Sequence, residues 1–73
     1  MISRGRFVNL LRTLGYSYHD RTKRTEIYRK TGGVHRVFLT LRQNLSESYA
    51  SSILLQCGLT PSQVQERIRE LKA

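Results

Sequence analysis

The first apolar pattern in the chain has the period of an α-helix. Its apolar residues recur at i, i+3, i+4 and i+7 and are Phe7, Leu10, Leu11 and Leu14. Ser3 precedes them with a hydroxyl that can cap a helix, and Gly15 follows them, where a left-handed residue often ends one. This spacing predicts a helix over residues 4–14.

After Gly15 the pattern changes to that of β-strands. Short runs rich in aromatic and β-branched residues alternate with polar segments, and they contain Tyr16, Tyr18, Ile27, Tyr28, Val34, Val37, Phe38, Leu39 and Leu41. The runs predict three strands, at residues 16–21, 25–31 and 35–41. Gly32 and Gly33 separate the last two, and because both tolerate a positive φ they predict a hairpin with antiparallel strands.

Two more helices are predicted in the last part of the chain. After Ser46, an apolar stripe that ends at Gly58 predicts a helix over residues 47–57, and it consists of Tyr49, Ala50, Ile53, Leu54 and Cys57. Residues 60–63 supply a capping threonine, a proline at the first helical position and a glutamine three residues after the cap. Apolar residues then repeat at helical spacing, so residues 60–73 should form a C-terminal helical extension.

The order helix, three strands, helix, helix predicts an α+β fold. Its centre would be a small three-stranded antiparallel sheet, with helices packed on one face. The chain has 73 residues, and a chain this short buries only about 60% of its unfolded surface. We therefore expect residues 1–73 to form a single domain with one modest core.

The composition excludes several kinds of site and location. Cys57 is the only cysteine, so the chain can form neither an internal disulfide nor a thiolate metal cluster. No apolar stretch approaches the roughly 18 residues of a membrane span, and the N-terminus lacks the apolar centre of a cleavable signal. We therefore expect a cytoplasmic protein without a membrane partner.

Basic residues are concentrated in the first part of the chain. The net charge is +8. Residues 1–42 hold ten Lys or Arg against two acidic residues, whereas residues 43–73 hold three of each. The high positive charge of residues 1–42 favours an anionic partner. The phosphate backbone of a nucleic acid is the commonest anionic partner in the cytosol. The alternative is a solvated basic face that only aids solubility.

Six of these cations are candidate phosphate ligands. They lie on the predicted strands and their turns and are Arg21, Lys23, Arg24, Arg29, Lys30 and Arg36. The densest cluster falls at the turn between the first two strands, where a strand-turn-strand edge can hold flexible cations on a ridge. A solvated loop is the alternative.

Aromatic residues lie among the cations and are candidates for stacking on bases. Successive side chains of a strand point to opposite faces. In the third strand Val37, Leu39 and Leu41 should therefore face the helices, which sends Arg36 and Phe38 to the other face. Phe38 is the better stacking candidate, and the alternative is that the strand aromatics belong to the core.

His19 and His35 are the only side chains that ordinarily exchange protons near neutral pH. Cleavage of RNA by general acid–base catalysis needs such a group beside the 2′-hydroxyl, so both are candidate catalytic residues. Ordinary surface or structural histidines are the alternative. Two histidines without a cysteine pair or a carboxylate cluster do not predict a metal site, and no motif predicts a cofactor.

Three local sequences together resemble the HicA toxin family, whose fold is like that of a double-stranded-RNA-binding domain. They are FVNLLRTLGY at residues 7–16, the strand pair EIYRK at 26–30 and RVFLTL at 36–41, and SILLQCGLT at 52–60. The resemblance covers nearly the whole chain, with residues 61–73 as an extension. It implies an mRNA-binding endoribonuclease that acts without metal, as the toxin of a type II toxin–antitoxin system, with an acidic HicB-like antitoxin as partner.

The chain departs from this family at the catalytic position. Members usually place Gly-Ser-His or Gly-Gly-His at the start of the second strand, where this chain has residues 23–25, Lys-Arg-Thr. The hydroxyl of Thr25, with no neighbouring base, cannot exchange a proton near neutral pH. A further proline and histidine are replaced by residues 41–44, Leu-Arg-Gln-Asn. The resemblance thus implies the fold and RNA affinity more strongly than cleavage.

Two other functions remain open at this point. A non-catalytic nucleic-acid-binding or regulatory module could keep the fold and the charge without the histidine. A protein-interaction module could instead use the basic face for an acidic protein partner.

Overall fold

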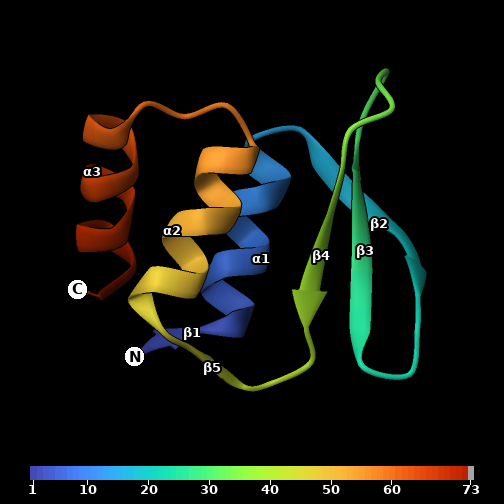
Figure 1. The fold of residues 1–73 in the computed structure, drawn as a ribbon, viewed down its shortest axis with the longest axis horizontal. Coiled ribbons are helices and arrows are strands. Elements are labelled where there is room, and N and C mark those ends of the chain that lie inside the picture. The colour runs from blue at the N-terminus through green and yellow to red at the C-terminus, as the bar shows by residue number, and fades with distance from the viewer. Residues whose placement is uncertain (73) are drawn as a thin grey trace.

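The computed structural model describes residues 1–72, so Ala73, the last residue of the expected extension, lies outside the described residues. Its elements are, in order, β1 (Ile2–Ser3), α1 (Arg4–Thr13), β2 (Tyr16–Arg21), β3 (Thr25–Lys30), β4 (Arg36–Thr40), β5 (Asn44–Leu45), α2 (Glu47–Gln56) and α3 (Pro61–Lys72) (Figure 1). The expected α+β fold, with a three-stranded antiparallel sheet between the first helix and two C-terminal helices, is confirmed.

The central strand of the sheet is β3, which pairs with β2 on one side and β4 on the other. Both pairings are antiparallel, as the hairpin signal predicts. The register of β2 shifts between Tyr18 and Asp20, which makes His19 the extra residue of a β-bulge. A bulge twists an edge strand and discourages pairing with another chain.

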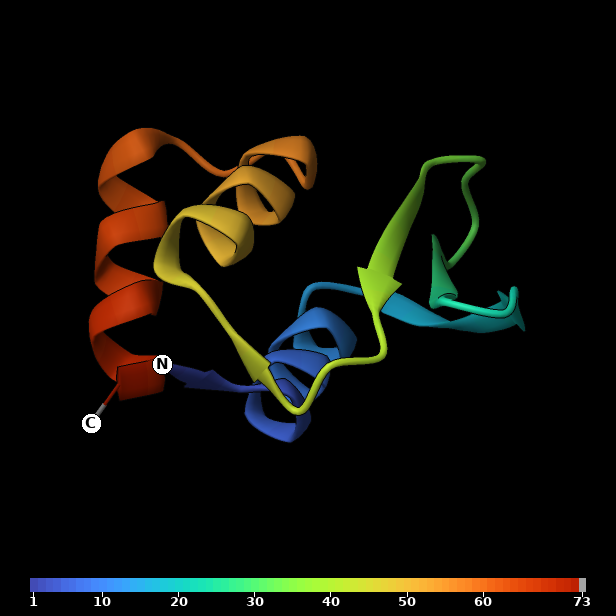
Figure 2. The same ribbon diagram turned by 60° about the horizontal axis from the view of Figure 1, so that its bottom comes forward.

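All three main helices lie on one side of the sheet. In both views α1 and α2 lie between the sheet and α3, and no described helix covers the opposite face (Figures 1 and 2). The strands present Tyr16, Tyr28, Val37 and Leu39 to the helices, and all four are buried. The alternation predicted for the third strand is therefore confirmed for Val37 and Leu39. Leu41, which was expected on the same face, lies beyond the end of β4 and lines an open hollow outside the core.

The core continues from the sheet through the helices. Its buried helical members are Phe7, Val8 and Leu11 of α1, Ala50, Ile53 and Leu54 of α2, and Val64 and Ile68 of α3. The C-terminal extension therefore shares the core of the rest of the chain. Within residues 1–72, no helix is both long enough and apolar enough to cross a bilayer.

A short strand pair, which the sequence pattern does not predict, joins the starts of the first two helices. Ile2 of β1 pairs with Leu45 of β5, and both side chains are fully buried. Ser3 and Ser46, the residues after them, cap α1 and α2 through their hydroxyls. The pair therefore fixes both helix N-termini at the same end of the molecule (Figure 1).

The boundaries of several elements differ from the expected ones by a single residue. Helix α1 ends at Thr13 and α2 at Gln56, each one residue earlier than expected, and the last residue expected in each helix is its cap. Strand β3 ends before Thr31, and β4 excludes His35 and Leu41. The two glycines after the helices have φ values of 94° and 93°, the left-handed conformation expected there.

We predict that the short strand pair is essential for stability. Leu45→Ala should lower the free energy of unfolding by about 2–5 kcal/mol, because it leaves a cavity in the core beside Ile2. Leu55→Ala is the matched control, since Leu55 is 50% exposed on α2, and should cost less than about 1 kcal/mol. Urea denaturation measures both values, and equal losses would contradict a core role for Leu45.

Candidate nucleic-acid interface

An open cleft lies between the β2–β3 turn and the segment that follows β4. We call it the turn cleft; its volume is about 570 Å³ and it is lined by Lys23, Arg24, Thr40, Leu41 and Arg42. The amide of Leu41 donates a hydrogen bond to the carbonyl oxygen of Arg24 at 3.3 Å, which joins its two sides. Its three cations are exposed and form no ion pair within residues 1–72. The turn cleft therefore gathers uncompensated positive charge.

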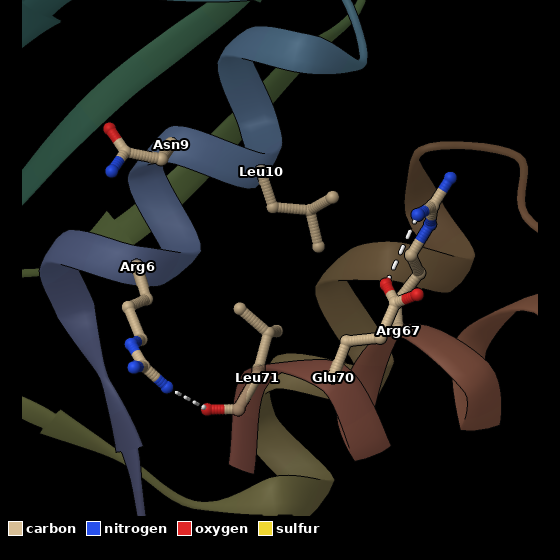
Figure 3. Close-up of a pocket in the computed structure, with 6 residues that line it drawn as sticks. All are labelled: Arg6, Asn9, Leu10, Arg67, Glu70 and Leu71. Carbon is tan, nitrogen blue, oxygen red and sulfur yellow. Dashed lines mark hydrogen bonds and ion pairs between the residues drawn. The ribbon is translucent and has the colours of Figure 1, made fainter. Parts of the chain in front are cut away.

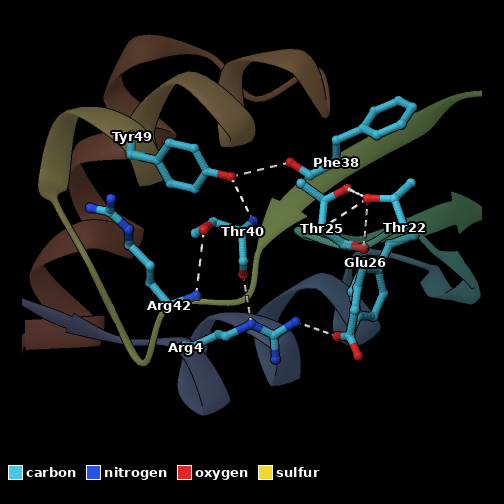
Figure 4. Close-up of polar contacts among 9 residues, drawn as sticks. Arg4, Thr22, Thr25, Glu26, Phe38, Thr40, Arg42 and Tyr49 are labelled. Atoms are coloured by element: carbon cyan, nitrogen blue, oxygen red, sulfur yellow. Dashed lines mark hydrogen bonds and ion pairs between the residues drawn. The ribbon is translucent and has the colours of Figure 1, made fainter.

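Threonine hydroxyls shape the turn that carries two of these cations. The Oγ1 atom of Thr22 accepts hydrogen bonds from the amides of Arg24 and Thr25, at 3.3 and 3.1 Å. It also lies 2.8 Å from the hydroxyl of Thr25. These bonds satisfy the turn locally, and Figure 4 shows the contact between Thr22 and Thr25. Lys23 and Arg24 lie between these two threonines, and both are exposed.

The other side of the turn cleft is held by side chains from both neighbouring helices. The hydroxyl of Tyr49, from α2, accepts from the amide of Thr40 at 2.8 Å and donates to the carbonyl of Phe38 at 3.2 Å. Arg4, from α1, donates through Nε to the carbonyl of Thr40 at 2.8 Å and forms an ion pair with Glu26 (Figure 4). The end of β4 is thus fixed at its backbone.

Glu26 carries the negative charge of this network. The hydrogen bond from Arg4 holds the pKa of its carboxyl below the ordinary value, and a hydrogen bond from the hydroxyl of Tyr28 and the charge of Arg21 act in the same direction. Burial and the carboxylate raise the pKa of Tyr28. Arg21 pairs with Glu26 in the sheet register, so its charge is partly compensated within the fold.

Lys30 is also used inside the fold. Its ammonium donates to the carbonyl of Leu14 at 2.7 Å and lies 5.2 Å from the centroid of the Tyr16 ring. A cation in this position ties β3 to the end of α1. Of the six cations singled out in the sequence, Lys30 thus contacts other groups of the protein, and the charge of Arg21 acts on Glu26.

The last two of the six candidate phosphate ligands lie opposite each other in the sheet. Arg29 of β3 is in register with Arg36 of β4, and both are exposed. Phe38 lies two residues further along β4 and is 55% exposed. Its expected position on the face away from the helices is confirmed.

The two histidines lie at different places and neither lines the turn cleft. The Nδ1 atom of His35 lies 2.6 Å from the hydroxyl of Tyr16, so His35 is part of a structural contact. His19 is exposed in the bulge of β2. Thr25, which stands where the resemblance implies a histidine, is paired with Thr40 instead. The structure therefore does not bring an imidazole to that position.

Tyr16 and the Cys57 thiol beside it are held in their neutral forms. Burial raises the pKa of Tyr16 to about 12, and the neighbouring Cys57 thiol adds to the effect. Burial also raises the pKa of the Cys57 thiol. Cys57 is half-buried against the core, as expected for a small apolar residue. At neutral pH neither group supplies a nucleophile.

A second hollow, between α1 and α3, is lined by side chains that contact other groups of the protein. It has a volume of about 290 Å³ and is lined by Arg6, Asn9, Leu10, Arg67, Glu70 and Leu71 (Figure 3). A guanidinium nitrogen of Arg6 donates to the carbonyl of Leu71 at 3.3 Å, and Arg67 pairs with Glu70 at 3.2 Å. The contact between Arg6 and Leu71 joins the extension to the first helix, whereas the pair of Arg67 and Glu70 lies within α3.

The sequence analysis did not identify three side chains that line or support the turn cleft. Arg42 was not among the expected phosphate ligands, because it follows the last predicted strand by itself. Arg4 and Tyr49 carry no local signal, since their partners are 36 and 9 residues away in the sequence. Among residues 1–72, no group of three or more His, Cys, Asp or Glu side chains is placed to hold a metal ion.

Comparison with protein-family models, with curated proteins and with solved structures gives no match to this chain.

We predict that the pair of Arg4 and Glu26 stabilises the fold only while the carboxyl is ionised. The folded pKa of Glu26 is lowered, so its contribution is present above the unfolded value of about 4.3 and disappears as the pH falls through the folded value. Glu26→Gln should therefore cost on the order of 1–2 kcal/mol at pH 7 and much less near pH 2.

The control is Glu70→Gln, because Glu70 pairs with Arg67 at an exposed position. It should change stability by less than about 0.5 kcal/mol at either pH. Thermal or urea unfolding across the pH range measures both variants. A loss in Glu26→Gln that does not depend on pH would contradict the role of the charge.

Proposed function

We propose that this protein binds RNA and that the turn cleft is its principal phosphate-binding site. The observation that carries the proposal is the convergence of three exposed, unpaired cations on one cleft. Lys23 and Arg24 come from the β2–β3 turn and Arg42 from the segment after β4. The resemblance to HicA toxins, which implies an RNA ligand and specifically mRNA, agrees with this site.

Electrostatics favours a polyanion as the ligand of the turn cleft. Like charges held close together destabilise a fold unless an anion or salt screens them. Phosphate groups accept hydrogen bonds from guanidinium and ammonium groups, and Arg is suited to bind them with two bonds at once. Contacts of this kind fix a nucleic acid on a protein without reading its sequence. We therefore expect binding with little sequence preference.

The same geometry supports binding more than cleavage. General acid–base cleavage needs a group that exchanges a proton near neutral pH beside the reacting hydroxyl. The lining of the turn cleft contains neither a histidine nor a carboxylate, and the Thr25 hydroxyl is hydrogen-bonded to Thr22. We infer that the HicA-like mechanism is lost in this chain.

An acidic protein is the second ligand that this charge would attract. The resemblance implies a HicB-like antitoxin, and such a partner should associate rapidly and in a salt-dependent manner with the surface that binds RNA. RNA and the acidic partner would then compete for the turn cleft. Binding of an acidic protein without any binding of RNA would favour a protein-interaction module instead.

We predict that the salt dependence of RNA binding comes from the turn cleft. Replacing Lys23, Arg24 and Arg42 together by Ala should reduce the slope of log K against log salt by about two to three units. The charge-matched control replaces Arg67, Arg69 and Lys72 of α3 by Ala and should change the slope by less than one unit. Fluorescence anisotropy with a labelled RNA at several salt concentrations measures the slopes.

Equal changes in the two triple variants would show that net charge alone drives binding. An unchanged slope in the first variant would place the phosphate site elsewhere.

We also predict that the purified protein cleaves RNA weakly or not at all. Loss of a general acid or base typically lowers a rate by about 10²–10⁴-fold. Incubation of a long RNA in EDTA with the wild type, His19→Ala and His35→Ala tests this directly. Any residual activity should depend on one of these histidines, and fast cleavage that survives both substitutions would contradict the inference.

A further inference from the structure

The face of the sheet that points away from the helices carries cations and an exposed aromatic ring. We call it the open face; it consists of Thr25, Ile27 and Arg29 of β3 and of Arg36, Phe38 and Thr40 of β4. No described helix covers it (Figures 1 and 2). It is therefore an uncovered surface of the protein.

The residues of β3 that lie between those of the open face contact the helices, and this establishes which way the open face points. Glu26 reaches Arg4 of α1, and Tyr28 is buried in the core. Because successive side chains of a strand point to opposite faces, Ile27 and Arg29 point away from the helices. Ile27 is in register with Phe38, and Arg29 with Arg36. The open face thus consists of successive cross-strand rows.

The row of two arginines is unfavourable for the sheet by itself. Like charges directly opposite each other destabilise a strand pair. Neither Arg29 nor Arg36 forms an ion pair with another side chain in the described part of the chain. A phosphate between the two guanidinium groups would remove this repulsion and would accept hydrogen bonds from both.

The next row provides a stacking surface. Phe38 is 55% exposed, whereas Ile27 beside it is only 9% exposed although it lies outside the core cluster. The aromatic ring therefore lies next to an apolar side chain that its neighbours already shield from water. A planar base can cover such a ring, because every nucleobase has an apolar face.

An acidic residue of the neighbouring strand β2, Asp20, also affects where a phosphate can lie on the open face. Asp20 of β2 is in register with Ile27, and so falls in the row of Phe38 rather than in the row of the arginines. Rows on one face are about 7 Å apart, the rise of two residues. The negative charge therefore disfavours a phosphate beside Phe38 and favours one between Arg29 and Arg36.

The open face continues into the turn cleft. After the row of Ile27 and Phe38 comes the row of Thr25 and Thr40, and Thr40 also lines the turn cleft. Cations thus lie at both ends of a surface with an aromatic ring between them. One strand of nucleic acid could contact both regions.

We propose that the open face binds single-stranded RNA, with an unpaired base stacked on Phe38 and a phosphate between Arg29 and Arg36. The inference rests on the proposed function, because it assigns the class of RNA that the protein prefers. A duplex is a poor ligand for this face, since its bases are already stacked on one another and their faces cannot reach Phe38.

The test compares two RNA probes, a 12-nucleotide oligoadenylate and a 12-base-pair RNA duplex. Phe38→Ala should weaken binding of the single strand by about fivefold to a hundredfold, the usual effect of losing one stacked base. Binding of the duplex should stay within about twofold of the wild type. Phe38→Tyr should retain the single-strand affinity, because tyrosine also stacks.

The matched control is Tyr18→Ala. Tyr18 is 51% exposed on the same sheet, but it contacts the ring of Tyr28 on the face of the helices. The Tyr18→Ala variant should therefore bind the single strand in preference to the duplex to the same extent as the wild type. Circular dichroism of each variant verifies that it is folded. Because Phe38 is exposed, we expect Phe38→Ala to remain folded.

The outcomes separate this inference from the proposed function. If Phe38→Ala changes neither probe while the triple replacement in the turn cleft weakens both, RNA binding stands and the open face has no role in it. Equal losses for both probes in Phe38→Ala would overturn the preference for single strands. Absence of RNA binding by the wild type at low salt would overturn both proposals.

Discussion

The rest of the fold depends on Arg4, which contacts three separate segments of the chain. Its backbone amide donates to the carbonyl of Gln43, its Nε atom to the carbonyl of Thr40, and its guanidinium pairs with Glu26. One residue at the start of α1 therefore holds β3, the end of β4 and the segment before β5. The turn cleft is built on that segment, so its shape depends on this partly buried ion pair.

The cations differ in whether they have a partner inside the fold, and this difference decides where positive charge remains on the surface. Arg4 and Lys30 are used inside the fold, where they bind a carboxylate and a backbone carbonyl. Within residues 1–72, the cations of the turn cleft and of the arginine row in the sheet form no ion pair. Positive charge without a partner in the fold therefore lies at the turn cleft and on the outer face of the sheet.

The resemblance to HicA toxins and the residues of the site lead to different expectations about chemistry. A ribonuclease of that type needs an imidazole near the start of β3, where this chain has Thr25 in a network of threonine hydroxyls. A phosphate-binding surface needs only cations and a stable backbone, both of which are present. The absence of an imidazole does not affect such a surface, because binding and proton transfer depend on different side chains.

The sequence by itself determined the elements whose signals are local. Helical spacing, capping residues and glycines defined all three long helices to within a residue at the ends compared, and the alternation in β4 placed Phe38 on the outer face. The charge of the first 42 residues and the absence of the histidine at Thr25 are also properties of the sequence alone.

Only the tertiary structure decided how distant segments combine. The pairing of Ile2 with Leu45, the meeting of Arg42 with the β2–β3 turn and the inward turn of Lys30 join residues far apart in the chain. Periodicity reports which face of an element is apolar and says nothing about which element packs against it. The partner of each cation, and hence the place where charge remains for a ligand, is fixed only when the core closes.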